Sequence, residues 1–164
     1  TVANNGVIYR PRLVQAVMDR TSGNLQELPA VPRGKINAKP ETFRIIKDAL
    51  ADVVTKGTAT RAKSSLVTIG GKTGTAQVAA LRTGPEENIP KTLRDHAWFV
   101  AFAPVESPKI AVAVLAEHMG HGGAAAAPLA KEVIETYMKL APQVPAVTSD
   151  LSGVKRSERS AKDS

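Results

Sequence analysis

The sequence contains no cysteine, which excludes disulfide bonds, zinc ribbons and thiol catalysis and leaves the redox compartment open. No apolar run approaches the ~18 residues of a membrane-spanning helix, and the first residues do not resemble a signal peptide. Three histidines, without an acidic cluster of ligand spacing, argue against a metal centre. What remains is a chain of 164 residues, 43% hydrophobic and 23% charged, which has the length and composition of one globular domain.

Aromatic residues are scarce, at 4%, while 22 Lys+Arg against 15 Asp+Glu give a net charge of +7. A basic chain of this kind is compatible with nucleic acid, an anionic membrane surface or an acidic polymer as partner. The charges are scattered, however, and the large aromatic residues lie among apolar neighbours, as core residues do. They are Phe43, Trp98, Phe99 and Phe102. We therefore expect no nucleic-acid partner.

The first part of the chain predicts turns and a hairpin. Residues 1–6 lack an initiator methionine and resemble the last turn of a helix ended by a left-handed Gly6, so we expect the chain to begin inside a longer protein. Two β-like runs, 13–18 and 25–28, flank a polar turn and predict a hairpin. The prolines and glycine of residues 29–34 predict a break in regular structure.

The remainder predicts an α+β fold in which helices flank an antiparallel sheet. Apolar periodicity predicts helices over 40–56 and 125–140. Strands are expected over 66–78, 97–103 and 110–116, the last two joined by a short hairpin connection. A long polar loop is expected over 82–95.

The chain divides into two parts by composition. Residues 1–140 carry the core signals and form the expected domain. Residues 141–164 form a polar tail that we expect to be disordered, since from Ser149 onward it offers serine and charge without an apolar period.

The segment Gly70-Gly71-Lys72-Thr73-Gly74-Thr75 carries the strongest chemical signal, and it admits three interpretations. It is a glycine-rich edge strand, whose glycines need a reason such as a bulge or a close backbone approach. It is a phosphate-binding loop, although Leu66 stands where that motif needs its first glycine. Or it is the Lys-Thr-Gly element of the penicillin-recognising serine enzymes.

The residue types suit the third interpretation. A lysine at a strand edge supplies positive potential for a substrate carboxylate. Thr73 and Thr75 lie two apart, so both hydroxyls face one side of a strand and can donate to that carboxylate. Gly74 lets a ligand lie close to the backbone, and the Thr75 N–H can serve a developing oxyanion.

Two longer stretches then carry a resemblance to a known family. The sequences GKTGTAQV (71–78) and LRDHAWFVAFAP (93–104) are similar to the C-terminal part of the class B penicillin-binding protein transpeptidases. Asn4-Asn5-Gly6 and Gly57-Thr58-Ala59 fit the same pattern, and the likeness covers roughly residues 1–140. Arg94-Asp95-His96 favours the elongation-specific group, penicillin-binding protein 2, over its septal relatives.

The resemblance implies a peptidoglycan D,D-transpeptidase that cross-links stem peptides by serine acyl transfer and binds β-lactams, with no cofactor and no metal. It implies substrate binding by Lys72, Thr73, Gly74 and Thr75, and a catalytic role for Thr75 as the oxyanion donor through its backbone N–H. It further implies the periplasmic face of the bacterial inner membrane, with elongation-complex membrane proteins as partners.

The family's nucleophile is the serine of a Ser-x-x-Lys element that precedes the Lys-Thr-Gly strand. Ser22-Gly23-Asn24 and Ser152-x-x-Lys155 match family spacings, but the first lies in a predicted turn and the second in the tail after Lys72. Neither setting holds a serine rigidly beside a base. We therefore expect the nucleophile in a missing N-terminal half of the domain, and expect the isolated chain to be inactive.

Other functions are compatible with the Lys-Thr-Gly segment, and the three histidines also have expected roles. A D,D-carboxypeptidase or serine β-lactamase relative would share Lys-Thr-Gly, and a non-catalytic penicillin-sensing or scaffold domain would share the fold. His96, at a strand start, is expected to be a structural hydrogen-bonding residue, while His118 and His121 are expected at the surface. The glycine loop of residues 120–123 is expected to act by turn chemistry rather than by binding an anion.

Overall fold

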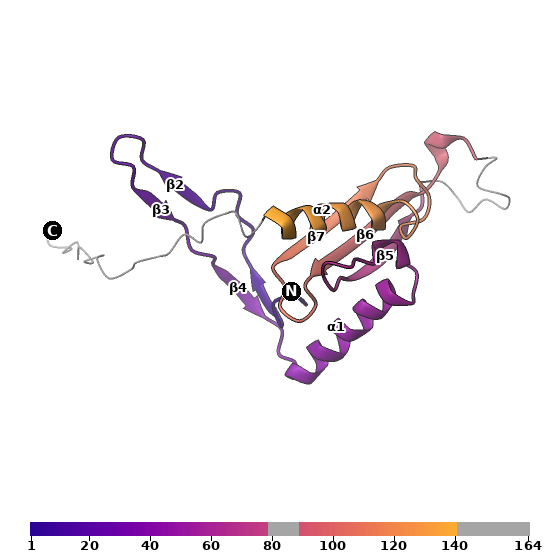
Figure 1. Cartoon of the computed structure of the whole chain (residues 1–164), viewed down its shortest axis with the longest axis horizontal. Coiled ribbons are helices and arrows are strands. Elements are labelled where there is room, and N and C mark those ends of the chain that lie inside the picture. The colour runs from indigo at the N-terminus through magenta and orange to yellow at the C-terminus, as the bar shows by residue number, and fades with distance from the viewer. Residues whose placement is uncertain (79–88, 141–164) are drawn as a thin grey trace, which may run out of the picture.

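The computed structural model describes residues 1–78 and 89–140, and a three-stranded antiparallel sheet forms its centre (Figure 1). The sheet has the order β5-β6-β7, with β5 at Gly70–Ala76, β6 at His96–Ala103 and β7 at Ile110–Ala116. Helix α1 (Pro40–Thr55) contacts β5, and helix α2 (Ala126–Leu140) packs on β6 and β7. The expected α+β class and the expected antiparallel sheet with flanking helices are confirmed.

One face of the sheet forms the core. Along β6, Ala97, Phe99, Ala101 and Ala103 alternate into the interior, because side chains of a strand point to opposite faces in turn. They meet small residues of α2 and the side chains of Val54 and Ile134. The other face carries Trp98, Val100 and Leu115, which are 38%, 48% and 42% exposed.

The strand that carries Lys72 is shorter than predicted, since β5 begins at Gly70 and not near residue 66. Residues 66–69 find their hydrogen bonds outside a strand ladder. The Leu66 N–H donates to Ser64 Oγ at 3.0 Å, and the Val105 N–H donates to the Thr68 carbonyl at 3.1 Å. The Thr68 hydroxyl donates to Glu106 at 2.6 Å and holds the pKa of that carboxyl below its usual value. Side-chain bonds of this kind compete with strand pairing.

The N-terminal third forms two further antiparallel ribbons. Strands β2 (Ala16–Met18) and β3 (Leu25–Glu27) confirm the predicted hairpin in shortened form. Strand β1 (Val7–Tyr9) pairs with β4 (Pro32–Lys35), so the predicted break at residues 29–34 is wrong for its second half. Pro32 is the first residue of β4, a position where its missing N–H does not interrupt the ladder. The left-handed backbone expected at Gly6 is confirmed, with φ +92°.

Two short 3-10 helices complete the described elements, η1 at Thr60–Ala62 and η3 at Lys91–Leu93. The second lies inside the predicted polar loop 82–95, of which residues 82–88 fall outside the described part. The predicted disordered tail, with Ser152, also falls outside it. No helix within residues 1–78 and 89–140 is long and apolar enough to cross a membrane.

Candidate active site

The Lys-Thr-Gly segment lies on β5 and borders an open cleft of about 470 Å³. Three segments distant in sequence meet there: Thr58 from the turn after α1, Lys72–Thr75 from β5, and His121–Ala124 from the loop before α2. The structure thus brings together all four predicted site residues. It adds Thr58 and the glycine loop, which the sequence analysis had not assigned to the site.

Hydroxyl groups line the centre of the cleft. The Thr58 and Thr73 Oγ1 atoms lie 2.9 Å apart and share a hydrogen bond. Thr75, two residues further along β5, is exposed and faces the same side of the strand. Because a hydroxyl both donates and accepts, one proton of the Thr58–Thr73 pair joins the two groups and the other is available to a ligand.

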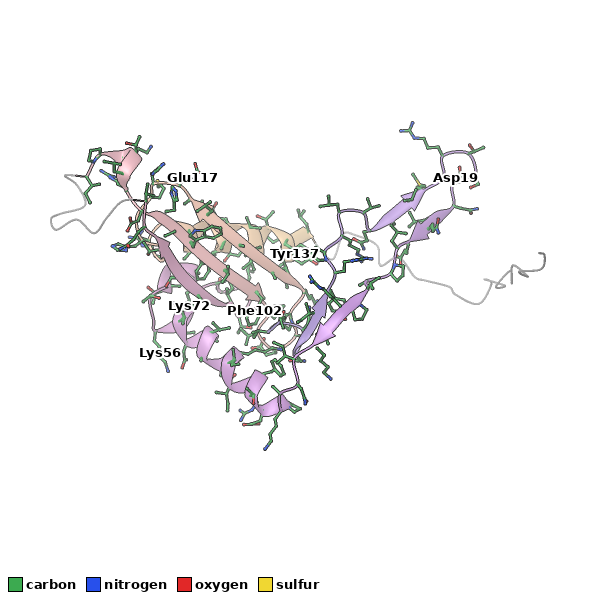
Figure 2. All side chains as sticks on the ribbon, turned by 180° about the vertical axis from the view of Figure 1, so that it is seen from behind. Asp19, Lys56, Lys72, Phe102, Glu117 and Tyr137 are labelled. Carbon is green, nitrogen blue, oxygen red and sulfur yellow. The ribbon has the colours of Figure 1, made fainter. Side chains whose placement is uncertain are left out.

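Lys72 supplies the positive charge beside these hydroxyls. Its side chain is exposed, and Nζ donates to the Thr73 carbonyl oxygen at 2.9 Å, which holds the ammonium group close to β5 (Figure 2). A lysine has three donors, so this bond leaves two for an anion. The cleft therefore combines an ammonium group with hydroxyl donors, the set that binds a carboxylate.

Glycine allows the opposite wall to approach β5. A Cβ atom on Gly122 would lie 2.1 Å from the Trp98 carbonyl oxygen and 2.7 Å from that of Gly74. A Cβ on Gly123 would lie 2.0 Å from the Thr58 carbonyl oxygen. A larger residue at Gly122 would push the loop away from the backbone of β5 and β6, and one at Gly123 would push it away from the turn that holds Thr58. The run of glycines was a usable signal, although the sequence analysis explained it by turn chemistry alone.

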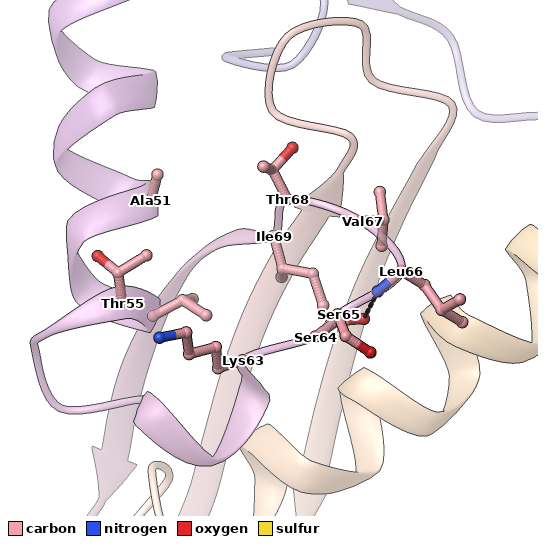
Figure 3. Close-up of a pocket in the computed structure, with 10 residues that line it drawn as sticks. Ala51, Thr55, Lys63, Ser64, Ser65, Leu66, Val67, Thr68 and Ile69 are labelled. Atoms are coloured by element: carbon pink, nitrogen blue, oxygen red, sulfur yellow. Dashed lines mark hydrogen bonds between the residues drawn. The ribbon is translucent and has the colours of Figure 1, made fainter.

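A second cavity, of about 390 Å³, lies between the end of α1 and residues 63–69 (Figure 3). Ser64 and Ser65 line it, but neither has a lysine three residues later. The Ser64 hydroxyl donates to Glu135 at 2.7 Å and accepts from the Leu66 N–H, so it has no free proton for acyl chemistry. This cavity also has a lysine, Lys63, and several hydroxyl groups, but none of its lining residues lies on a strand and no glycine loop faces them, so the cleft at β5 remains the candidate site.

Other residues considered for chemistry have structural roles. Ser22 lies in the turn of the β2–β3 hairpin, which extends away from the central sheet (Figure 1). Its Oγ accepts from the Asn24 N–H at 3.3 Å. His96 accepts a hydrogen bond through Nδ1, as a structural residue would. His121 is exposed as expected, and it also lines the cleft. No group of three metal-ligating side chains occurs within the described residues.

Comparison with known proteins defines the class to which this site belongs. Residues 1–135 match the family described as penicillin binding protein transpeptidase domain, so the chain belongs to that family. It is 34% identical over 144 residues to peptidoglycan D,D-transpeptidase MrdA of Haemophilus influenzae and 36% identical over 141 residues to that of Acinetobacter baumannii. These alignments cover 84% and 83% of this chain but only 22% and 20% of the relatives, so the chain spans about a fifth of their length.

Solved structures show the same fold. The D,D-transpeptidase domain of a peptidoglycan glycosyltransferase from Eggerthella lenta superimposes with a TM-score of 0.68 at 27% identity, over 87% of this chain and 30% of that one. The penicillin G acyl-enzyme of penicillin-binding protein A from M. tuberculosis gives 0.62 at 31% identity, over 84% and 29%. The resemblance inferred from the Lys-Thr-Gly segment is therefore confirmed at the level of family and fold.

Proposed function

We propose that this chain supplies the substrate-binding wall of a peptidoglycan D,D-transpeptidase that cross-links stem peptides and is acylated by β-lactams. The convergence of Lys72, Thr73 and Thr58 on one cleft carries the proposal. The names of the curated relatives support it, as do the β-lactam acyl-enzyme complexes among the similar solved structures.

Each residue has a distinct role in this proposal. The Lys72 ammonium group and the Thr73 and Thr75 hydroxyls bind the terminal carboxylate of a D-Ala-D-Ala stem peptide or the carboxylate of a β-lactam. Gly74 lets the ligand backbone lie along β5. The Thr75 N–H donates to the oxyanion that forms when a serine attacks the ligand carbonyl, and such a donor accelerates acylation because it is already oriented.

The serine itself comes from another part of the protein. No serine is among the described residues that line the cleft, and the relatives extend far beyond the part that this chain matches. Attack by that serine would release D-alanine and form an acyl-enzyme, which the amine of a second stem peptide then resolves. The remainder of the domain would also cover the exposed apolar residues Trp98, Val100 and Leu115. Residues 1–140 form this domain segment, and residues 141–164 a tail beyond it.

We propose that the full-length protein acts at the periplasmic face of the inner membrane, where its substrate is, alongside elongation-complex membrane proteins.

The proposed reaction is tested by supplying the full-length protein with a pentapeptide ending in D-Ala-D-Ala, with and without an acceptor amine. We expect D-alanine release together with transfer of the peptide to the amine, both abolished by penicillin. Release without transfer would indicate a D,D-carboxypeptidase. Covalent labelling without turnover would indicate a penicillin sensor, and rapid penicillin hydrolysis a β-lactamase.

A further inference from the structure

Two histidines join the ends of neighbouring strands close to the candidate site. His96 is the first residue of β6, and His118 lies two residues beyond the end of β7. Their ring centroids are 4.6 Å apart and the rings are tilted by 59°. The backbone N–H of His118 donates to His96 Nδ1 at 2.9 Å, and His118 Nδ1 lies 3.1 Å from the Arg94 carbonyl oxygen. We call these two histidines with their hydrogen bonds the histidine clasp.

The hydrogen bonds define where each ring carries its proton. His96 Nδ1 accepts from a backbone N–H, so it must be unprotonated and the neutral ring carries its proton on Nε2. A carbonyl oxygen can only accept, so His118 Nδ1 must be protonated to bond with Arg94. His96 Nδ1 therefore acts as an acceptor and His118 Nδ1 as a donor. A side chain without an acceptor at the Nδ1 position cannot replace His96.

The histidine clasp fixes the loop that forms one wall of the cleft. His118 adopts a left-handed backbone with φ +56°, which turns the chain back toward β6 after β7. The Gly120 N–H donates to the Asp95 carbonyl oxygen at 2.9 Å, adding a bond between the same two segments. Directly after it come His121 and Gly122, which line the cleft.

The histidine clasp lies beside the C-terminal end of β5, next to Thr75. His96 is the register partner of Ala76, the residue that follows Thr75. At the other end of the same loop, the Gly122 carbonyl oxygen accepts from the Ala126 and Ala127 N–H groups of α2. The loop is thus held at both ends, by the clasp before it and by the helix after it. Releasing the clasp leaves the bond from the Gly120 N–H to the Asp95 carbonyl oxygen as the remaining tie at this end, and so loosens the wall beside Thr75.

We propose that His96 and His118 are positioning residues for acyl transfer, which act by holding the loop of residues 118–123 at a fixed distance from β5. Neither histidine lines the cleft, so they act through the loop and not on the ligand. This inference rests on the proposed transpeptidase function of the cleft, and it adds to that function two residues outside the Lys-Thr-Gly segment.

A pair of variants in the full-length protein tests the clasp. His96→Asn places an amide oxygen near the position of Nδ1 and keeps an acceptor for the His118 N–H, whereas His96→Gln places its amide near Nε2. We expect His96→Gln to lower the second-order rate of acylation by penicillin about tenfold, the order of one lost hydrogen bond. His96→Asn should stay within about twofold of the unmodified protein. The His118 amide should exchange its hydrogen faster in His96→Gln and at the original rate in His96→Asn.

The outcomes separate this inference from the proposed function. If the unmodified protein is not acylated, the proposed function fails and the positioning role falls with it, while the exchange of the His118 amide still reports whether the bond exists. If the unmodified protein is acylated and His96→Gln reacts equally fast, or His96→Asn loses as much as His96→Gln, the clasp has no positioning role. Should His96→Gln not fold, His118→Ala removes the donor to Arg94 together with the ring that lies against His96, and keeps the backbone N–H that bonds to His96. It is expected to slow acylation at least about threefold, and an unchanged rate would overturn the proposal.

Discussion

Replacing Lys72 by alanine in the full-length protein is expected to lower the rate of acylation by penicillin at least about 100-fold, the order observed when one oriented donor is removed from a site of this kind. The ammonium group is held next to β5 by its bond to the Thr73 carbonyl oxygen, and among the described residues that line the cleft there is no other lysine and no arginine, aspartate or glutamate. Its loss removes the attraction for the ligand carboxylate.

The same change should barely affect stability. Lys72 is exposed, and surface substitutions away from special features usually change the free energy of unfolding by less than about 0.5 kcal/mol. Lys63→Ala provides the matched control, because Lys63 is also exposed and precedes β5 but lines the second cavity instead of the cleft. Stopped-flow acylation and thermal unfolding of both variants give the comparison. Equal acylation by Lys72→Ala and Lys63→Ala would refute the binding role of Lys72.

Replacing Gly71 by alanine is expected to destabilise the fold by about 3 kcal/mol, at the upper end of what overpacking a core usually costs. The new Cβ would lie 2.4 Å from Phe99 Cζ and 2.9 Å from the Val100 carbonyl oxygen. The Phe99 side chain is fully buried and the carbonyl belongs to the sheet, so neither can move aside without disturbing the core.

Gly34 offers the control for this prediction. It lies in strand β4, and a Cβ there would meet no atom within 4 Å. Urea unfolding of the two alanine variants should show a lower midpoint for Gly71→Ala and a near-unchanged one for Gly34→Ala. If both variants unfold at the same urea concentration, the close approach of β5 to Phe99 is not what requires glycine before Lys72.

The helices and strands that could be predicted from the sequence are those that a repeating pattern of nearby residues specifies. The apolar period of α1, the alternation along β6 and the uninterrupted apolar run of β7 each satisfy one simple rule. The start of β5 was predicted too early because Val67 and Ile69 suit a strand, yet the bonds of Thr68 go to Val105 and Glu106. Such partners lie 37 or more residues away, and no local pattern reveals them.

In the candidate site, too, the residues specified by a local motif were predictable and those that depend on distant partners were not. Lys72, Thr73 and Thr75 were predictable because their chemistry is contained within six consecutive residues. Thr58 was not assigned to the site because its partner Thr73 is 15 residues away, and only folding brings the hydroxyls to 2.9 Å. The reason for the glycines became clear only when Phe99 and the Trp98 carbonyl oxygen were found against Gly71 and Gly122.

In the proposed reaction this chain binds the ligand while a serine from another part of the protein attacks it. Intact-mass analysis with peptide mapping, after incubation with penicillin, tests this division of roles directly. We predict one covalent adduct on the full-length protein, at a serine outside residues 1–164, and none on the 164-residue chain alone. An adduct on Ser22, Ser64 or any other serine of this chain would contradict the account.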